Sequence, residues 1–547
     1  MSSMPKSFGR VLSFLFCLAN LCLVGDNSIA QDAKQEKKLQ YEVHVTLKLV
    51  QVYVTDKKGN PIVDLAKDEF SIFDTGKPQE ITEFEKHILT FPSSKEEAQP
   101  EPAETPGAPA KELMPRKFFL LFDFAFNNGI GLEKSRKAAI HFIDHQVQPT
   151  DEISLLSYSA AKSLKLHEYL TTDHKKIRDV VKRIGMESIS GRAENFEAQY
   201  WEAKAFANPA EASRDGTVFD PKEIYGEERE WGWERSRQES KMQARNFALK
   251  MMELAKALRY VPGQKHIVLL SSGVPYSLIY GIQSPLGKIG VDEFGDSWLQ
   301  QEFEDMLKEL SATNCSIYAL DTQELSSMVG SDQRMQGAAS LQKITNATGG
   351  KYFGNINSYE AHVEKIQELT GCYYVLGYYV GDAWDGAYRK IKVEVSRPGC
   401  NVLAQRGYFN PKPFKEYNDM ERMLHLIDLA LSEEPLFQTP VRFPLAVVPC
   451  PPDGKGNLCL AAQVLLKDIR EIMTGSVEMV TVIFDENEDI AALKKSQRKV
   501  SALTGERVSF GGSFSLPAGT YKCRFIIRNL ETGKGAVASA TAVIPEQ

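Results

Sequence analysis

Residues 116–128 read RKFFLLFDFAFNN, and this stretch decides the fold class of the chain. Lys117–Phe122 predicts a strand, because its nearly unbroken apolar run lies between a basic start and a polar turn. Strands buried on both faces are typical of parallel sheets that are covered by helices. Side chains just beyond the carboxyl end of such a strand lie where open α/β sheets bind their ligands. Asp123 stands at that point, so it is the first candidate functional residue.

The same kind of strand recurs along residues 116–371. Two further buried strands, at 266–270 and 316–320, end in Ser271-Ser272-Gly273 and in Asp321. Helices with an apolar stripe are predicted between and after these strands, at 132–147, 174–184, 238–260, 297–313, 341–347 and 359–370, with a further short strand at 351–353. This alternation predicts a doubly wound, mostly parallel α/β sheet with helices on both faces.

Two features modify the alternation. Residues 152–158 and 163–169 predict a hairpin, since their link is too short for a crossover, and the sheet therefore gains an antiparallel edge strand. Two insertions, 187–237 and 275–296, lie next to strand ends. Such insertions are either binding loops or local cover over a helix, and the sequence leaves both interpretations open.

Segments on both sides of this domain predict smaller β units. Residues 41–90 and 372–411 each hold short strands that need a partner sheet, so we expect the two segments to pack together. The apolar phase changes near Val50, which predicts a bulge or a move between sheets. Residues 91–115 form a linker rich in Pro and Glu. Residues 417–547 predict a helix followed by a C-terminal β-sandwich.

The first thirty residues predict an export signal. Lys6 and Arg10 precede the apolar run Val11–Val24, and small residues follow before Gln31. Because the run is shorter than the ~20 residues that span a bilayer, we expect residues 1–30 to be cleaved. The mature chain is then expected to lack a membrane span and to be periplasmic or secreted.

Composition bears on partners and on disulfides. The chain has 547 residues, of which 43% are hydrophobic and 25% charged, and its net charge of −7 offers no basic face for nucleic acid. Of the eight cysteines, Cys17 and Cys22 lie in the leader, and the six that remain are too few for a disulfide scaffold. Cys450 and Cys459 flank a turn-rich loop, where a bridge and two free thiols are equally consistent with the sequence.

Residues 41–411 resemble a known family. The order of elements in 116–371 resembles the von Willebrand factor type A domain. The flanking motifs resemble those of von Willebrand A-related proteins of exported bacterial, especially acidobacterial, type; they read VQVYVTDKKGNPIVDLAKDEFSIFDTGKPQEITEF from Val50, TGCYYVLGYY from Thr370 and RGYF from Arg406. The resemblance implies binding of another protein, in an adhesion or scaffold role.

The resemblance also implies a metal-ion-dependent adhesion site at the top of the sheet. In the family, a DxSxS turn, a Thr from a following loop and a later Asp hold Mg²⁺ through oxygen ligands. Asp123 matches the first Asp, whereas Ala125 and Asn127 replace the two Ser residues. Ser271-Ser272-Gly273 stands where the second carboxylate is expected, and Ser190 or the nearby Ser188 stands for the Thr.

The adhesion site is therefore degenerate. The site has one carboxylate where the family has two, and Ala125 offers no hydroxyl. The remaining oxygen ligands would therefore bind the strongly hydrated Mg²⁺ only weakly. We expect Asp123 to cap the following turn or helix, with a weak Mg²⁺ site at Asp123, Asn127 and Ser271 as the alternative and no other cofactor. The expected protein-binding face comprises Asp123, Ala125, Asn127, Asn128, Ser190, Ser271 and Ser272.

Motifs for chemistry are missing from the sequence. There is no G-x-S-x-G, H-E-x-x-H or G-x-x-x-x-G-K. His141 and His145 have a metal-binding spacing, but a polar helix face accounts for them, because no third ligand is suggested. Trp231 and Trp233 suit a partner anchor, and they suit equally well an internal contact of the insertion.

These observations predict an exported, non-catalytic protein that binds a protein partner in the envelope or the extracellular space. Two alternatives from other classes stay open. The C-terminal domain could make the chain an exported hydrolase or carbohydrate-active protein, or the whole chain could be a structural component of the envelope.

Overall fold

The computed structural model describes most of the chain after the leader. The described residues are 45–88, 115–207, 233–281, 295–323, 331–354, 356–381, 385–404, 406–410, 412–450, 457–501, 503 and 505–545. The expected signal, nearly all of the linker, Trp231 and parts of both insertions lie outside these residues, as does the side chain of Trp233. Residues 45–547 form one compact unit.

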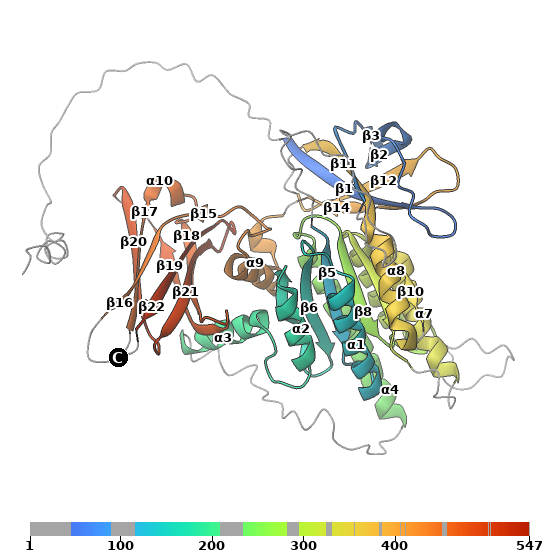
Figure 1. Cartoon of the computed structure of the whole chain (residues 1–547), viewed down its shortest axis with the longest axis horizontal. Coiled ribbons are helices and arrows are strands. Elements are labelled where there is room, and N and C mark those ends of the chain that lie inside the picture. Colours follow the sequence, from blue (N-terminus) through green and yellow to red (C-terminus); the bar gives the residue numbers. More distant parts are fainter. Residues whose placement is uncertain are drawn as a thin grey trace, which may run out of the picture. The chain divides into compact units, whose positions relative to one another are not determined.

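A six-stranded sheet forms the centre of the α/β domain, in the order β10-β9-β8-β5-β6-β7 (Figure 1). All neighbouring strands are parallel except β6 and β7, which are antiparallel. The strands are β5 (Lys117–Asp123), β6 (Glu152–Ser159), β7 (Ser163–Thr171), β8 (Lys265–Ser271), β9 (Cys315–Asp321) and β10 (Tyr352–Phe353). The predicted fold class, a doubly wound, mostly parallel sheet with an antiparallel edge strand, is confirmed.

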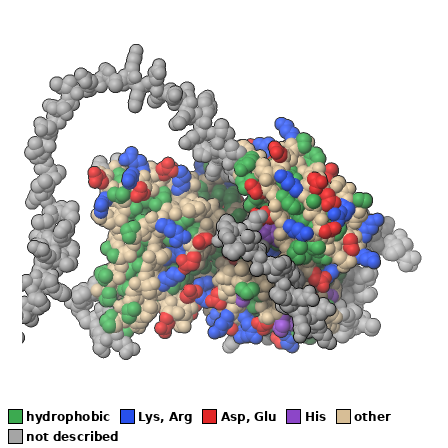
Figure 2. Space-filling model, turned by 45° about the horizontal axis from the view of Figure 1, so that its top comes forward, with side chains coloured by type: hydrophobic (Ala, Val, Ile, Leu, Met, Phe, Trp, Pro, Cys, Tyr) green, Lys and Arg blue, Asp and Glu red, His purple; other side chains and the backbone are tan. Residues whose placement is uncertain are grey.

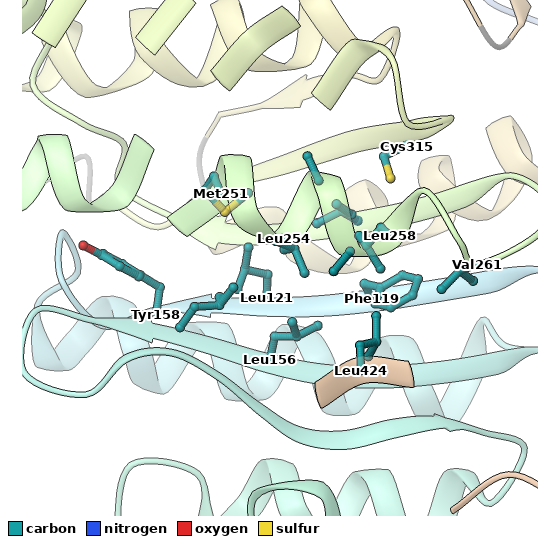
Figure 3. Close-up of a cluster of buried hydrophobic side chains, with 14 of the residues drawn as sticks. Phe119, Leu121, Leu156, Tyr158, Met251, Leu254, Leu258, Val261, Cys315 and Leu424 are labelled. Atoms are coloured by element: carbon teal, nitrogen blue, oxygen red, sulfur yellow. The ribbon is translucent and has the colours of Figure 1, made fainter. Parts of the chain in front are cut away.

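Helices cover both faces of this sheet. On one face, Phe118, Leu120 and Phe122 pack with α1 (Gly129–His145), α2 (His174–Arg183) and α8 (Tyr359–Gly371). On the other face, Phe119 and Leu121 pack with α4 (Trp233–Leu258), α6 (Ser297–Ser311) and α7 (Ser331–Thr348). Figure 3 shows this second cluster, with Met251, Leu254 and Leu258 of α4 beside the strands. Because successive side chains of a strand point to opposite faces, the apolar run of β5 serves both layers.

Two further helices complete the α/β domain. They are α3 (Arg192–Ala207) and α5 (Tyr276–Tyr280), each within one of the predicted insertions. The helices that begin near strand ends are capped by short polar side chains: Asn128 accepts from the Gly131 amide, Asp173 from Lys176 and Asp296 from Leu299. These caps satisfy amides that have no partner inside the helix.

The N-terminal β unit combines strands from both sides of the α/β domain. One sheet has the order β13-β1-β11-β4 and the other β14-β12-β2-β3. Val50, Val52, Tyr374 and Leu376 lie between the two sheets. The bulge expected near Val50 is wrong, since β1 pairs with β11 over eight consecutive residues without a shift. The strands are β1 (Val45–Thr55), β2 (Phe70–Asp74), β3 (Lys77–Gln79), β4 (Glu83–Ile88), β11 (Cys372–Gly381), β12 (Tyr388–Val395), β13 (Asn401–Ala404) and β14 (Gly407–Phe409).

The C-terminal region is a helix, α9 (Asp419–Leu431), followed by a two-sheet sandwich. The larger sheet has the order β15-β22-β21-β18-β19 and the smaller β16-β17-β20. The sequence pattern predicts strands near 443–448, 458–467, 477–485, 508–516, 520–529 and 536–543, which correspond to six of these strands, whereas β15 and β19 were not predicted. The strands and a short helix are β15 (Val441–Arg442), β16 (Leu445–Cys450), β17 (Asn457–Leu465), α10 (Leu466–Ile469), β18 (Gly475–Phe484), β19 (Ile490–Val500), β20 (Arg507–Ser515), β21 (Gly519–Asn529) and β22 (Gly535–Ile544).

Surface charge and cysteine state complete the description. On the face drawn in Figure 2, basic and acidic side chains are interspersed rather than gathered by sign. Among the described helices, none combines the length and the apolar character needed to cross a bilayer. Cys459 is disulfide-bonded, whereas Cys315, Cys372, Cys400 and Cys523 are free thiols. The pairing of Cys459 with Cys450 stays a prediction.

Candidate functional site

The carboxyl ends of the central strands bring three polar side chains to one edge of the sheet. Asp123 ends β5, Ser271 ends β8 and Asp321 ends β9. Strand order reverses between β5 and β8, so this is the switch point at which doubly wound sheets form a ligand crevice. The structure therefore places the sequence-predicted Asp123 and Ser271 together, at the expected place.

Asp123 is fully occupied by internal hydrogen bonds. Its Oδ1 accepts from the backbone amides of Ala125 (2.9 Å) and Phe126 (3.1 Å), and its Oδ2 accepts from the Ser271 hydroxyl at 2.5 Å. The residue is 0% exposed. Burial raises the pKa of Asp123 to about 6, although these three hydrogen bonds act in the opposite direction. Asp123 thus caps the turn that follows β5.

Asn127 closes the crevice between β5 and β8. Its Nδ2 donates to the Leu270 carbonyl at 3.1 Å, and its Oδ1 accepts from the hydroxyl of Thr322. Ser272 donates its hydroxyl to the Phe126 carbonyl. Thr322 is a site residue that the sequence analysis missed. Its position one residue after the β9 strand end was the available signal, because the ends of parallel strands meet at one edge.

The other predicted site residues have separate roles. Ala125 contributes only its backbone, and its carbonyl accepts from Gln243 Nε2 at 2.8 Å. Asn128 caps α1 through the Gly131 amide at 2.7 Å. Ser190 lies beside β7, where its amide donates to Glu194, so the structure does not bring it to the Asp123 site.

The residues present do not fit a metal-ion-dependent adhesion site. The oxygens of Asp123 already accept three hydrogen bonds, and Asp321 accepts from the Tyr352 hydroxyl (2.7 Å) and the Gln323 amide (3.0 Å). No cluster of three or more His, Cys, Asp or Glu suited to a metal occurs in the described part of the chain. A divalent cation would have to displace these bonds at a site with no exposed carboxylate.

We expect millimolar Mg²⁺ or Mn²⁺ to leave the thermal unfolding midpoint unchanged. A ligand that binds the folded state raises the midpoint, and a closed Asp123 site offers no such binding. Differential scanning calorimetry with and without EDTA measures this directly. A midpoint that rises with metal concentration, and does not rise in Asp123→Asn, would restore the adhesion-site interpretation.

A second polar group, Ser157–His167–Glu194, lies on the outer strands and was missed from sequence. Ser157 Oγ is 2.7 Å from His167 Nε2, and His167 Nδ1 is 2.6 Å from Glu194 Oε2. These are the contacts of a hydroxyl–imidazole–carboxylate relay, yet all three residues are buried. Ser157 is inside β6, which pairs with a strand on each side. Since Glu194 is in the first turn of α3, the group fastens α3 to the sheet.

Comparisons with known proteins add a structural likeness only. No protein-family model matches the chain, and no curated protein matches its sequence. An aerotolerance-related membrane protein from Bacteroides fragilis aligns with 46% of this chain and 98% of its own, at 11% identity and a TM-score of 0.22. The conserved hypothetical protein BatB from Bacteroides thetaiotaomicron has the same coverage, at 10% identity and 0.21. The pilus adhesin SpaC from Lactobacillus rhamnosus GG aligns with 78% of this chain and 57% of its own, at 8% and 0.24. TM-scores this low carry no argument about function.

Proposed function

We propose that this chain is an exported, non-catalytic protein that binds another protein through the carboxyl edge of its six-stranded sheet. In this proposal the partner contacts the rigid, closed surface around Asp123 directly, and no metal ion mediates the contact. Export rests on the leader in residues 1–30, and the absence of metal rests on the saturated carboxylate of Asp123. An adhesion or scaffold role is the function that this arrangement supports best.

The observation that carries the proposal is a set of exposed apolar side chains at this edge. Trp298, the second residue of α6, is 77% exposed, and Ile130 at the start of α1 is 54% exposed. Met242 and Met186 are also exposed. Large exposed apolar side chains are costly in water and are typical of contact surfaces, where Trp supplies much of the binding energy.

Contacts of adjacent residues support a location of these side chains near the site. Ile130 is two residues after Asn128, which caps α1. Met242 precedes Gln243, which donates to Ala125. Met186 follows Gly185, whose position packs against the ring of Phe124. Trp298 follows Asp296, which pairs with Lys241 of α4 at 3.4 Å. The four apolar side chains therefore belong to segments that adjoin the site, and we infer that they lie near the closed crevice.

We expect the double variant Trp298→Ser, Ile130→Ser to lose partner capture by about tenfold or more, since a buried Trp anchor contributes 2 kcal/mol or more to binding. The measurement is cross-linking and pull-down from envelope extract, with quantification of the captured protein. Capture should survive EDTA, because no metal takes part.

A matched control is available elsewhere on the surface. Tyr379 and Val543 are exposed to a similar extent but lie in the β units. Tyr379→Ser, Val543→Ser should therefore retain full capture. Equal losses in the two double variants would place the contact surface away from the carboxyl edge and refute the proposal.

A further inference from the structure

The C-terminal sandwich has an open side where its two sheets differ in size. The larger sheet ends at β19 and the smaller sheet ends at β20, so both are edge strands. A groove of about 450 Å³ lies between them. In a closed sandwich, the inner side chains of both sheets interdigitate and are buried. The groove therefore lies where a further strand of the smaller sheet would face β19.

The β20 side of the groove is apolar. The register with β17 sets Val508, Phe510 and Phe514 opposite core residues Val464, Ala462 and Leu458, so these three side chains face inward. Each of them is only half-buried, although the corresponding residues of β17 are buried. Apolar surface is thus left accessible along the whole length of β20.

The β19 side of the groove is basic. The register with β18 sets Lys494 and Arg498 opposite Thr481 and Val477, of which Val477 is in the sandwich core. Both cations therefore extend from the inner face, and both are exposed. Among the described residues neither forms a salt bridge, and the groove lining contains Lys and Arg but no Asp or Glu. Cations at these inner positions hide the period-two apolar pattern of β19, so this strand is not predicted from the sequence.

One of two adjacent glycines on β20 shows how open the groove is. A Cβ added at Gly512, which faces inward opposite Leu460, would meet no atom within 4 Å. A Cβ added at Gly511, on the opposite face of the strand, would only touch the Leu460 carbonyl at 3.7 Å. Glycines in a strand interior often mark a place where another backbone approaches.

We propose that β20 binds an extended acidic and apolar peptide of a partner protein as a fourth strand of the smaller sheet. The outer edge of β20 presents backbone amides and carbonyls over nine residues, which strand addition would pair. Inward apolar side chains of the peptide would contact Phe510 and Phe514, and acidic ones would reach Lys494 and Arg498. This site is separate from the carboxyl edge of the α/β domain and does not depend on that proposal.

The test is binding of a synthetic nine-residue peptide to the full chain, measured by fluorescence anisotropy. The probe peptide has Thr at every odd position, and its even positions carry Val and Glu by turns. One matched peptide has Lys in place of Glu, and another has Pro at the Thr positions, which removes backbone donors but keeps the charge. Only the first peptide is expected to bind.

Protein variants locate the binding. Gly512→Trp should abolish binding because the indole fills the groove, whereas Gly511→Trp on the opposite face of the same strand should bind normally. Lys494→Glu, Arg498→Glu should weaken binding by about tenfold or more, from two lost charge pairs and the repulsion that replaces them. The matched control, Lys57→Glu, Lys58→Glu, changes two exposed lysines outside the sandwich and should have no effect.

Other outcomes overturn the proposal. Binding of the proline peptide would indicate a simple anion site without strand addition. Equal effects of Gly511→Trp and Gly512→Trp would place the peptide outside the groove. No binding of any probe, or binding that is insensitive to Lys494→Glu, Arg498→Glu, would leave the two cations with only the role of protecting an edge strand from aggregation.

Discussion

Replacing Asp123 with alanine is expected to lower the free energy of unfolding by about 3 kcal/mol relative to the Asp123→Asn protein. Alanine leaves the amides of Ala125 and Phe126 and the hydroxyl of Ser271 without their acceptor in a fully buried site. Asparagine keeps an oxygen at the position of Oδ1, so it retains the bonds that hold the turn. Urea unfolding of both variants at pH 7, followed by near-UV circular dichroism, measures the difference.

The pH dependence separates the capping role from a charged role. The pKa of Asp123 is raised from 3.8 to about 6 by burial, so the folded state holds its proton more tightly than the unfolded state. Stability should therefore fall as pH rises from about 4 to about 6, by about 3 kcal/mol from this group. Asp123→Asn should lose that slope and be no less stable than the natural protein at pH 7. Equal destabilisation by Asn and Ala would show that the carboxylate charge itself is required.

Replacing Glu478 with glutamine is expected to cost about 3–5 kcal/mol, since it leaves buried cations without a counter-charge. Glu478 is fully buried; its Oε2 accepts from Arg528 at 2.6 Å and its Oε1 lies 3.0 Å from Lys495 Nζ. Tyr200 of α3 also donates to Oε1, at 2.8 Å. The loss should therefore loosen α3 from the sandwich as well, and faster proteolysis near α3 would report it.

The acid limit of stability tests the same cluster. Burial acts to raise the pKa of Glu478, but the charges of Arg528 and Lys495 outweigh it and hold the pKa at about 2, below its usual 4.5. The contribution is fully present above about pH 4.5 and is lost as pH falls toward 2, a change of about 3 kcal/mol. Glu471 is the control, because its pair with Lys534 is exposed and Glu471→Gln should leave the free energy of unfolding nearly unchanged. Similar costs for Glu471→Gln and Glu478→Gln would contradict the role given to burial.

The two proposed surfaces lie on different domains and would bind different kinds of partner structure. The carboxyl edge presents exposed apolar side chains around a crevice that is already closed, which suits a preformed partner surface. The groove of the sandwich presents unpaired strand edges, which suit an extended segment. The Glu478 cluster and the groove lie on opposite faces of the larger sheet. Val477, the residue before Glu478 on β18, lines the groove, and successive side chains of a strand point to opposite faces.

Much of the α/β domain followed from local patterns. The run of residues 117–122 predicted a central strand because a strand with neighbours on both sides must be apolar on both faces. Asp123 and Ser271 were placed at one edge because parallel strands end together. Ser157 and His167 could also have been found, since the hairpin register sets alternate residues of β6 and β7 on the same face. By contrast, β19 could not have been found from the sequence, because its inner positions carry Lys494 and Arg498.

By itself, then, the sequence determined the α/β class, the place of Asp123 and the degenerate set of site residues, because these depend on residue type and on spacing along the chain. Only the tertiary structure decided that the site is closed. Asn127 contacts Leu270 and Thr322, which are 143 and 195 residues away, and such contacts exist only once the strands have assembled. The open side of the sandwich has the same origin, since a missing strand is a property of two sheets together and of no single segment.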